Sequence, residues 1–117
     1  MARLSTQVLD TSRGTPAAGI QIELHAVRGD ERARVAAAIT NADGRTDAPL
    51  LTGDRIEPGV YELIFHAGAY LRRAGASVSE PPFLDQIVIR FGVADPTGHY
   101  HVPLLLSPYG YSTYRGS

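Results

Sequence analysis

The chain has 117 residues, with 44% hydrophobic and 20% charged side chains and a net charge of −1, which indicates one globular domain over residues 1–117. This balance argues against a nucleic-acid binder, because such proteins usually gather basic residues on one face. Lysine and cysteine are absent, which excludes Schiff-base chemistry, thiol nucleophiles and cysteine metal sites. No segment resembles a secretory signal or approaches the roughly 20 apolar residues of a membrane span, so we expect a cytoplasmic protein that does not bind membranes.

The first predicted strand covers residues 3–10, because polar and apolar side chains alternate there. One face carries Leu4, Thr6 and Val8, and the other carries Ser5, Gln7 and Leu9. After a loop rich in glycine and proline, further strands are predicted over residues 20–28 and 33–41. Alternation in the second of these predicts that one face carries Val35, Ala37 and Ile39.

The middle of the chain is predicted to turn sharply at residues 41–44, since aspartate and glycine favour the backbone angles of tight turns. A short edge strand is expected from Arg45 to Leu51. The clearest strand runs from Gly59 to His66, and a helix of about two turns is expected over residues 68–75. The last strands are predicted over residues 84–94, 99–107 and 110–115.

Seven or eight short strands at regular spacing, with one short helix, predict an all-β protein built as a two-sheet sandwich. The chain has neither a glycine-rich phosphate loop nor an alternation of strands and helices. Both absences argue against a nucleotide-binding fold.

Two histidines stand at the start of one predicted strand, at positions 99 and 101. Residues two apart in a strand point to the same face, so both imidazoles could converge on one ligand. The alternative is a pair of exposed histidines beside a turn, without a function. A metal site needs at least one more ligand, and no spacing in the sequence suggests one, so we expect no metal.

The C-terminal segment, residues 107–117, is rich in tyrosine. A chain end normally frays, but this composition favours a docked segment. The alternative to a functional tail is a final edge strand whose tyrosine rings cover the core. Both interpretations predict an ordered tail.

Three collinear blocks of the sequence resemble the family of 5-hydroxyisourate hydrolases. The block HYHVPLLLSPYGYSTYRGS, at residues 99–117, is very similar to the closing motif of that family. Residues 4–25 resemble its first two strands, and residues 41–51 resemble its middle motif. Transthyretin shares a stretch like the one around residue 110 but lacks the histidine pair and the Arg-Gly-Ser ending. The resemblance covers essentially the whole chain.

The resemblance implies a transthyretin-like (prealbumin-like) sandwich that pairs into dimers, which stack into a homotetramer with active sites at the dimer–dimer contact. It implies hydrolysis of 5-hydroxyisourate, a small-molecule substrate, to 2-oxo-4-hydroxy-4-carboxy-5-ureidoimidazoline in urate degradation. The reaction opens a ring at a cyclic amide and uses no cofactor and no metal.

The resemblance also implies a role for individual side chains. His101 falls on the catalytic histidine, whose neutral imidazole can take a proton from water and return it to the leaving nitrogen. Arg45 falls on the substrate-binding arginine, which could also stabilise an oxyanion. Ser117, with Tyr114 nearby, falls on tail residues that close the pocket and bind the substrate. Without the resemblance, Arg45 would be a solvated turn residue and Ser117 a frayed end.

Gln7 stands where the family usually has a histidine that shares in activating the water. A glutamine cannot act as an acid or a base near neutral pH, but it can orient a water molecule. Three explanations are open: an engineered change, a natural variant in which His101 transfers the proton alone, or a relative that has drifted toward ligand binding.

Three classes of function therefore remain to be compared. The leading hypothesis is a hydrolase of 5-hydroxyisourate, and the alternative is a non-catalytic transthyretin-like protein that binds a small ligand. An immunoglobulin-like structural domain fits the predicted fold but leaves the histidine pair and the tail unexplained.

Overall fold

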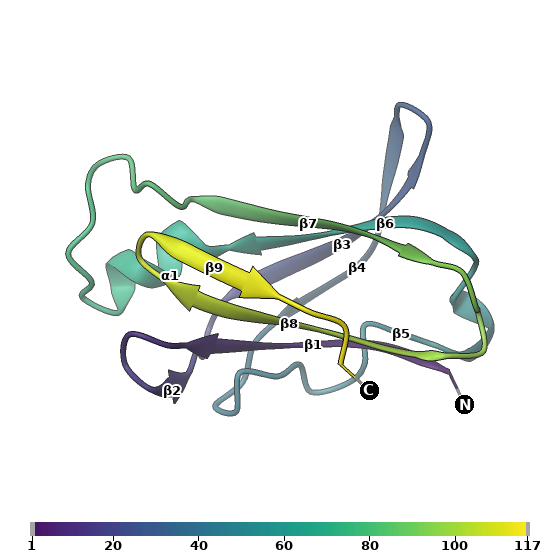
Figure 1. The fold of residues 1–117 in the computed structure, drawn as a ribbon, viewed down its shortest axis with the longest axis horizontal. Helices are drawn as coiled ribbons and strands as arrows, with labels where there is room; N and C mark the ends of the chain where they lie inside the picture. Colours follow the sequence, from purple (N-terminus) through teal and green to yellow (C-terminus); the bar gives the residue numbers. More distant parts are fainter. Residues whose placement is uncertain (1, 117) are drawn as a thin grey trace.

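The computed structural model describes residues 2–116 and shows two β-sheets packed face to face (Figure 1). This confirms the predicted all-β sandwich with one short helix. Its elements are β1 (Arg3–Asp10), β2 (Thr15–Pro16), β3 (Gln21–Arg28), β4 (Glu31–Ile39), β5 (Leu51–Thr52), η1 (Gly53–Arg55), β6 (Gly59–His66), α1 (Ala67–Arg73), β7 (Gln86–Val93), β8 (His99–Ser107) and β9 (Gly110–Thr113). Within residues 2–116, none of the helices has the length and apolar character needed to cross a membrane.

One sheet has the strand order β2-β1-β8-β9, with β5 also paired to β1, and the other has the order β4-β3-β6-β7. The β1–β8 pair is the one parallel pair among the described strands, and it joins the two ends of the chain. Its register sets Arg3 opposite His99 and Ser5 opposite His101. This register brings the first strand beside the predicted histidine pair.

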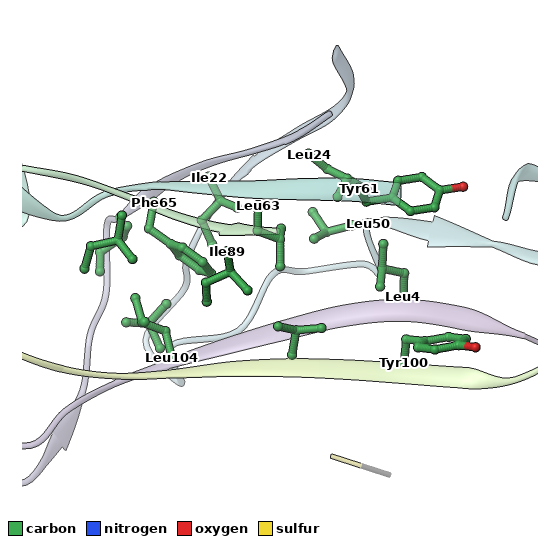
Figure 2. Packing of buried hydrophobic residues seen from close by; sticks show 14 of the residues in the cluster. Leu4, Ile22, Leu24, Leu50, Tyr61, Leu63, Phe65, Ile89, Tyr100 and Leu104 are labelled. Atoms are coloured by element: carbon green, nitrogen blue, oxygen red, sulfur yellow. The ribbon is translucent and has the colours of Figure 1, made fainter. Parts of the chain in front are cut away.

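The core lies between the two sheets, where side chains from both inner faces meet (Figure 2). Leu4 and Leu104 come from one sheet, and Leu24, Leu63 and Phe65 come from the other; all five are fully buried. Each such side chain contributes roughly 1.5–3 kcal/mol by leaving water. Because every second residue of β1 and β8 is committed to this core, the intervening residues must face outward.

A β-bulge overturns the predicted faces of β4. Leu24 pairs with Ala36 but His25 pairs with Arg34, so Val35 is an extra residue in the ladder. An extra residue reverses the faces of all residues beyond it. Ala36 and Ala38 therefore pack partly buried against the core, whereas Ile39, which was expected to share a face with Val35, is 58% exposed.

The prediction of an edge strand from Arg45 to Leu51 was also wrong. Arg45 makes a single bridge with Gln7, the following residues form a loop, and only Leu51 and Thr52 pair with β1. Pro49 lies within this stretch and lacks the backbone N–H that a strand ladder requires. The last strand likewise ends at Thr113, two residues before its predicted end.

Candidate active site

A cavity of about 330 Å³ opens on the outer face of the β1–β8 pair, near the first residues of both strands. The first residues of β1 and of β8, which are distant in sequence, line this cavity together with the loop after residue 44. The lining residues with polar side chains are Arg3, Ser5, Thr6, Arg45, Thr46, Asp47, His99, Tyr100 and His101. The structure thus brings Arg45 and His101, both predicted as site residues, to one cavity.

His101 is partly buried and held on two sides. Its Nδ1 lies 2.9 Å from the Ser5 hydroxyl, and its carbonyl oxygen accepts a 2.7 Å hydrogen bond from the Gly116 backbone N–H. Burial lowers the pKa of the His101 imidazole below its ordinary value of 6.5, and the positive charges of Arg45 and Arg3 lower it further. His101 is therefore neutral near pH 7, the form that can accept a proton.

Arg45 lies at the end of a tight turn, and the Asn41 side chain stabilises the shape of this turn. The Asn41 side-chain oxygen accepts hydrogen bonds from the backbone N–H groups of Asp43 and Arg45, at 2.9 and 3.2 Å. Gly44 has a φ of 73°, and a Cβ there would lie 2.3 Å from the Val8 carbonyl oxygen, so only glycine fits. The Arg45 side chain extends from this turn, and its guanidinium makes no hydrogen bond or ion pair with any side chain of residues 2–116.

Arg3 was not predicted as part of this site, whereas His99 was considered only as one of the histidine pair at positions 99 and 101. They lie opposite each other in the β1–β8 register, are exposed, and line the same cavity. Asp47 is the one carboxylate among the lining residues. The cavity therefore carries more positive than negative charge, which suits an anionic ligand or one rich in carbonyl oxygens. Nothing in the sequence indicated a role for Arg3, because the parallel pairing of β1 with β8 is what brings it to the cavity.

Gln7 lies outside the cavity, although it is two residues beyond Ser5 on the same outward face of β1. Its side-chain N–H donates a 3.0 Å hydrogen bond to the Asp43 carbonyl oxygen, and its backbone bridges Arg45. In this chain the Gln7 side chain therefore braces the turn that carries Arg45.

The two predicted residues of the tail are placed differently. Tyr114 is 60% exposed and lines a separate hollow between β7 and the end of β9, beside Ile89 and Arg90. It does not reach the cavity of His101 within one chain. Ser117 lies outside the described residues. Its neighbour Gly116 packs against His101, and a Cβ at position 116 would lie 3.0 Å from the His101 Cδ2.

The residues at the cavity can accept a proton at a neutral imidazole and bind an oxygen-rich ligand with guanidinium groups. In the described part of the chain, no three histidine, aspartate or glutamate side chains are arranged to hold a metal ion. The structure is therefore a two-sheet sandwich with a polar cavity on the outer face of one sheet, and the size and lining of this cavity suit a small polar molecule.

Comparison with known proteins shows which family the chain resembles. The model of the HIUase/Transthyretin family matches residues 4–116. The chain is 56% identical to the 5-hydroxyisourate hydrolase of Pseudomonas aeruginosa over 117 residues, which cover 100% of this chain and 93% of that protein. It is similar to the crystal structure of (S)-allantoin synthase, with a TM-score of 0.94 and 44% identity over 99% of this chain and 44% of that chain. It is also similar to sea bream transthyretin in complex with thyroxine, with a TM-score of 0.86 and 30% identity over 98% and 95% of the two chains.

The chain belongs to the HIUase/Transthyretin family.

Proposed function

We propose that this protein hydrolyses 5-hydroxyisourate, opening a ring at a cyclic amide to form 2-oxo-4-hydroxy-4-carboxy-5-ureidoimidazoline. The observation that carries the proposal is the meeting of two groups in one cavity: the His101 imidazole, whose pKa is lowered, and the Arg45 guanidinium. The 56% identity to a bacterial 5-hydroxyisourate hydrolase supports the same substrate.

In the proposed reaction, the neutral imidazole of His101 takes a proton from water as the water oxygen attacks the amide carbonyl carbon. The Arg45 guanidinium holds carbonyl oxygens of the substrate and stabilises the oxyanion that forms. The C–N bond then breaks, and the imidazolium returns its proton to the leaving nitrogen. The carbonyl carbon becomes a carboxylate, which remains beside the cationic groups of the cavity.

We also propose that the active form is a homotetramer, a dimer of dimers. The cavity opens on the outer face of the β1–β8 sheet, so a second copy stacked on this face would enclose it. Enclosure would exclude water and strengthen the interaction of Arg45 with the substrate. Tyr114 and Ser117 are then expected to bind substrate within the assembly, and Gln7 is expected to orient the water or to hold the Arg45 turn.

A second candidate is a non-catalytic protein that binds a small ligand. The likeness to sea bream transthyretin in complex with thyroxine favours it, because that protein has the same fold and its structure contains a bound small molecule. The lack of a second histidine at position 7 points in the same direction.

The two candidates differ in turnover. Freshly made 5-hydroxyisourate is mixed with catalytic amounts of the protein, and its absorbance decay is compared with the spontaneous decay. The proposal expects many turnovers per subunit, with the ring-opened carboxylate identified as the product. Stoichiometric binding without faster decay would contradict the proposed hydrolysis and favour the binding protein.

A further inference from the structure

Ser5 stands directly opposite His101 in the parallel register of β1 and β8. Both residues are partly buried, and both side chains point to the outer face, toward the cavity that they line. The Ser5 hydroxyl oxygen lies 2.9 Å from the His101 Nδ1, a hydrogen-bond distance. Ser5 thus contacts the imidazole without belonging to the residues predicted for the site.

The imidazole ring is held between two parts of the chain. Ser5 contacts its Nδ1, and Gly116 approaches its Cδ2 edge so closely that a Cβ there would lie 3.0 Å away. The other ring nitrogen, Nε2, has no hydrogen-bond partner within residues 2–116. Nε2 is therefore the nitrogen left to meet a ligand or water in the cavity.

The hydroxyl of Ser5 matches what a general base at Nε2 requires. A lone pair at Nε2 means that Nδ1 carries the hydrogen, and a serine oxygen can accept a hydrogen bond from it. When Nε2 takes a proton, Nδ1 keeps its hydrogen and the same bond persists. One oxygen thus serves both protonation states without any movement of the ring.

We propose that Ser5 is a positioning residue, which holds the orientation of the His101 ring and accepts a hydrogen bond from its Nδ1–H, so that Nε2 faces the cavity as the base. Its effect on turnover rests on the proposed function. Its effect on the imidazole itself rests on the contact alone, so the two can be tested apart.

A hydroxyl in this position could instead serve only to join two strands. The next residue, Thr6, does so on the core side of β1: although Thr6 borders the cavity, its buried hydroxyl donates a 2.7 Å hydrogen bond to the Val102 carbonyl oxygen. Thr6→Val removes this bond between the same strands without removing a contact to His101. It is therefore the matched control for Ser5→Ala.

The test compares Ser5→Ala, Ser5→Thr and Thr6→Val by ¹⁵N NMR of the His101 ring and by steady-state kinetics. Ser5→Ala is expected to reduce the population with hydrogen on Nδ1 and to lower kcat about tenfold, the size of one hydrogen bond, with little change in KM. Ser5→Thr restores the hydroxyl and is expected to restore both readings. Thr6→Val is expected to lower Tm and to leave the His101 nitrogen signals unchanged.

Unchanged nitrogen signals in Ser5→Ala would overturn the proposal, as would a Thr6→Val protein that alters them equally. A Ser5→Ala protein with altered signals but wild-type kcat would also overturn it. If the wild-type protein shows no turnover, the proposed function fails, and the NMR comparison then decides the Ser5 contact by itself.

Discussion

The outer faces of the two sheets carry the same kinds of side chains but treat their charges differently. On the β3–β6 face, Glu23 bonds both His25 and His66, at 3.1 and 2.8 Å. Glu62, which is 5% exposed, accepts a 2.7 Å hydrogen bond from Arg32 and also meets Arg90. Each histidine and arginine named here has a carboxylate partner within the same chain.

The β1–β8 face lacks this internal pairing. Arg3 and Arg45 make no ion pair with residues 2–116, and His101 contacts a neutral hydroxyl in place of a carboxylate. A charge already satisfied by a neighbour gains little from a ligand, whereas an unpaired one gains much. The candidate binding face therefore differs from the other face in how its arginine and histidine side chains are paired, and not in the presence of these residue types.

The largest effect is expected when one histidine on each face is replaced by asparagine. His101→Asn removes the only proposed base and is expected to lower kcat/KM by roughly 10²–10⁴-fold, since that is the usual contribution of general-base catalysis. His66→Asn, on the other face, is expected to keep wild-type activity. Steady-state decay of 5-hydroxyisourate measures both, and equal losses in the two variants would contradict the assignment.

Arginines on the two sheets offer a second comparison. Arg45→Gln removes the unpaired guanidinium from the cavity and is expected to lower kcat/KM about 10²-fold, the scale for loss of one oxyanion-stabilising group. Arg34→Gln, on the exposed edge strand β4, is the matched control and should have no effect. Steady-state kinetics of the two purified variants measure both values of kcat/KM. Retained activity in Arg45→Gln would show that Arg45 takes no part in the mechanism.

A third comparison concerns Gln7, the position at which the family resemblance led us to expect a histidine. Gln7→His adds an imidazole beside the cavity that can share the proton transfer, so we expect kcat to rise about tenfold. The matched change, Gln86→His at an exposed residue of β7, should leave kcat unaltered. A fall in kcat for Gln7→His would show instead that the hydrogen bond from Gln7 to Asp43, which braces the Arg45 turn, is the more important role.

The smallest expected effect concerns the paired face. The hydrogen bond from Arg32 is the main cause that lowers the pKa of Glu62 below its ordinary value of 4.5, with Arg90 adding to it. A lowered folded-state pKa stabilises the protein above about pH 4.5, and this stability is lost as the pH falls through the folded value. Glu62→Gln should therefore lower Tm near neutral pH and match the wild type at strongly acidic pH. A Tm difference that does not change with pH would contradict this account.

Alternation of side chains predicted some strands well because nothing interrupts them. The bounds of β1, β6 and β8 match the prediction, since each strand keeps one buried face throughout. It failed in β4, because the extra residue at Val35 reverses the faces beyond the bulge. The pattern of side chains within one strand does not predict a bulge, because the position of a bulge depends on the partner strand.

The site was only partly predictable for a related physical reason. The family resemblance located Arg45 and His101, and the structure brings both to one cavity. Arg3 and Ser5 were missed because their role depends on the parallel pairing of β1 with β8, a contact between residues almost 100 positions apart. Such long-range register cannot be read from a single strand.

In the proposed function, the unpaired cationic face carries the chemistry, with neutral His101 as its base. The pH dependence of kcat/KM in the wild type and in Arg3→Gln tests it most directly. Burial and the charges of Arg45 and Arg3 lower the His101 pKa, so wild-type activity should fall with acidification only below about pH 6.5, and removing Arg3 should move this fall to higher pH. A profile that falls at or above pH 6.5, or that does not move in Arg3→Gln, would contradict the account.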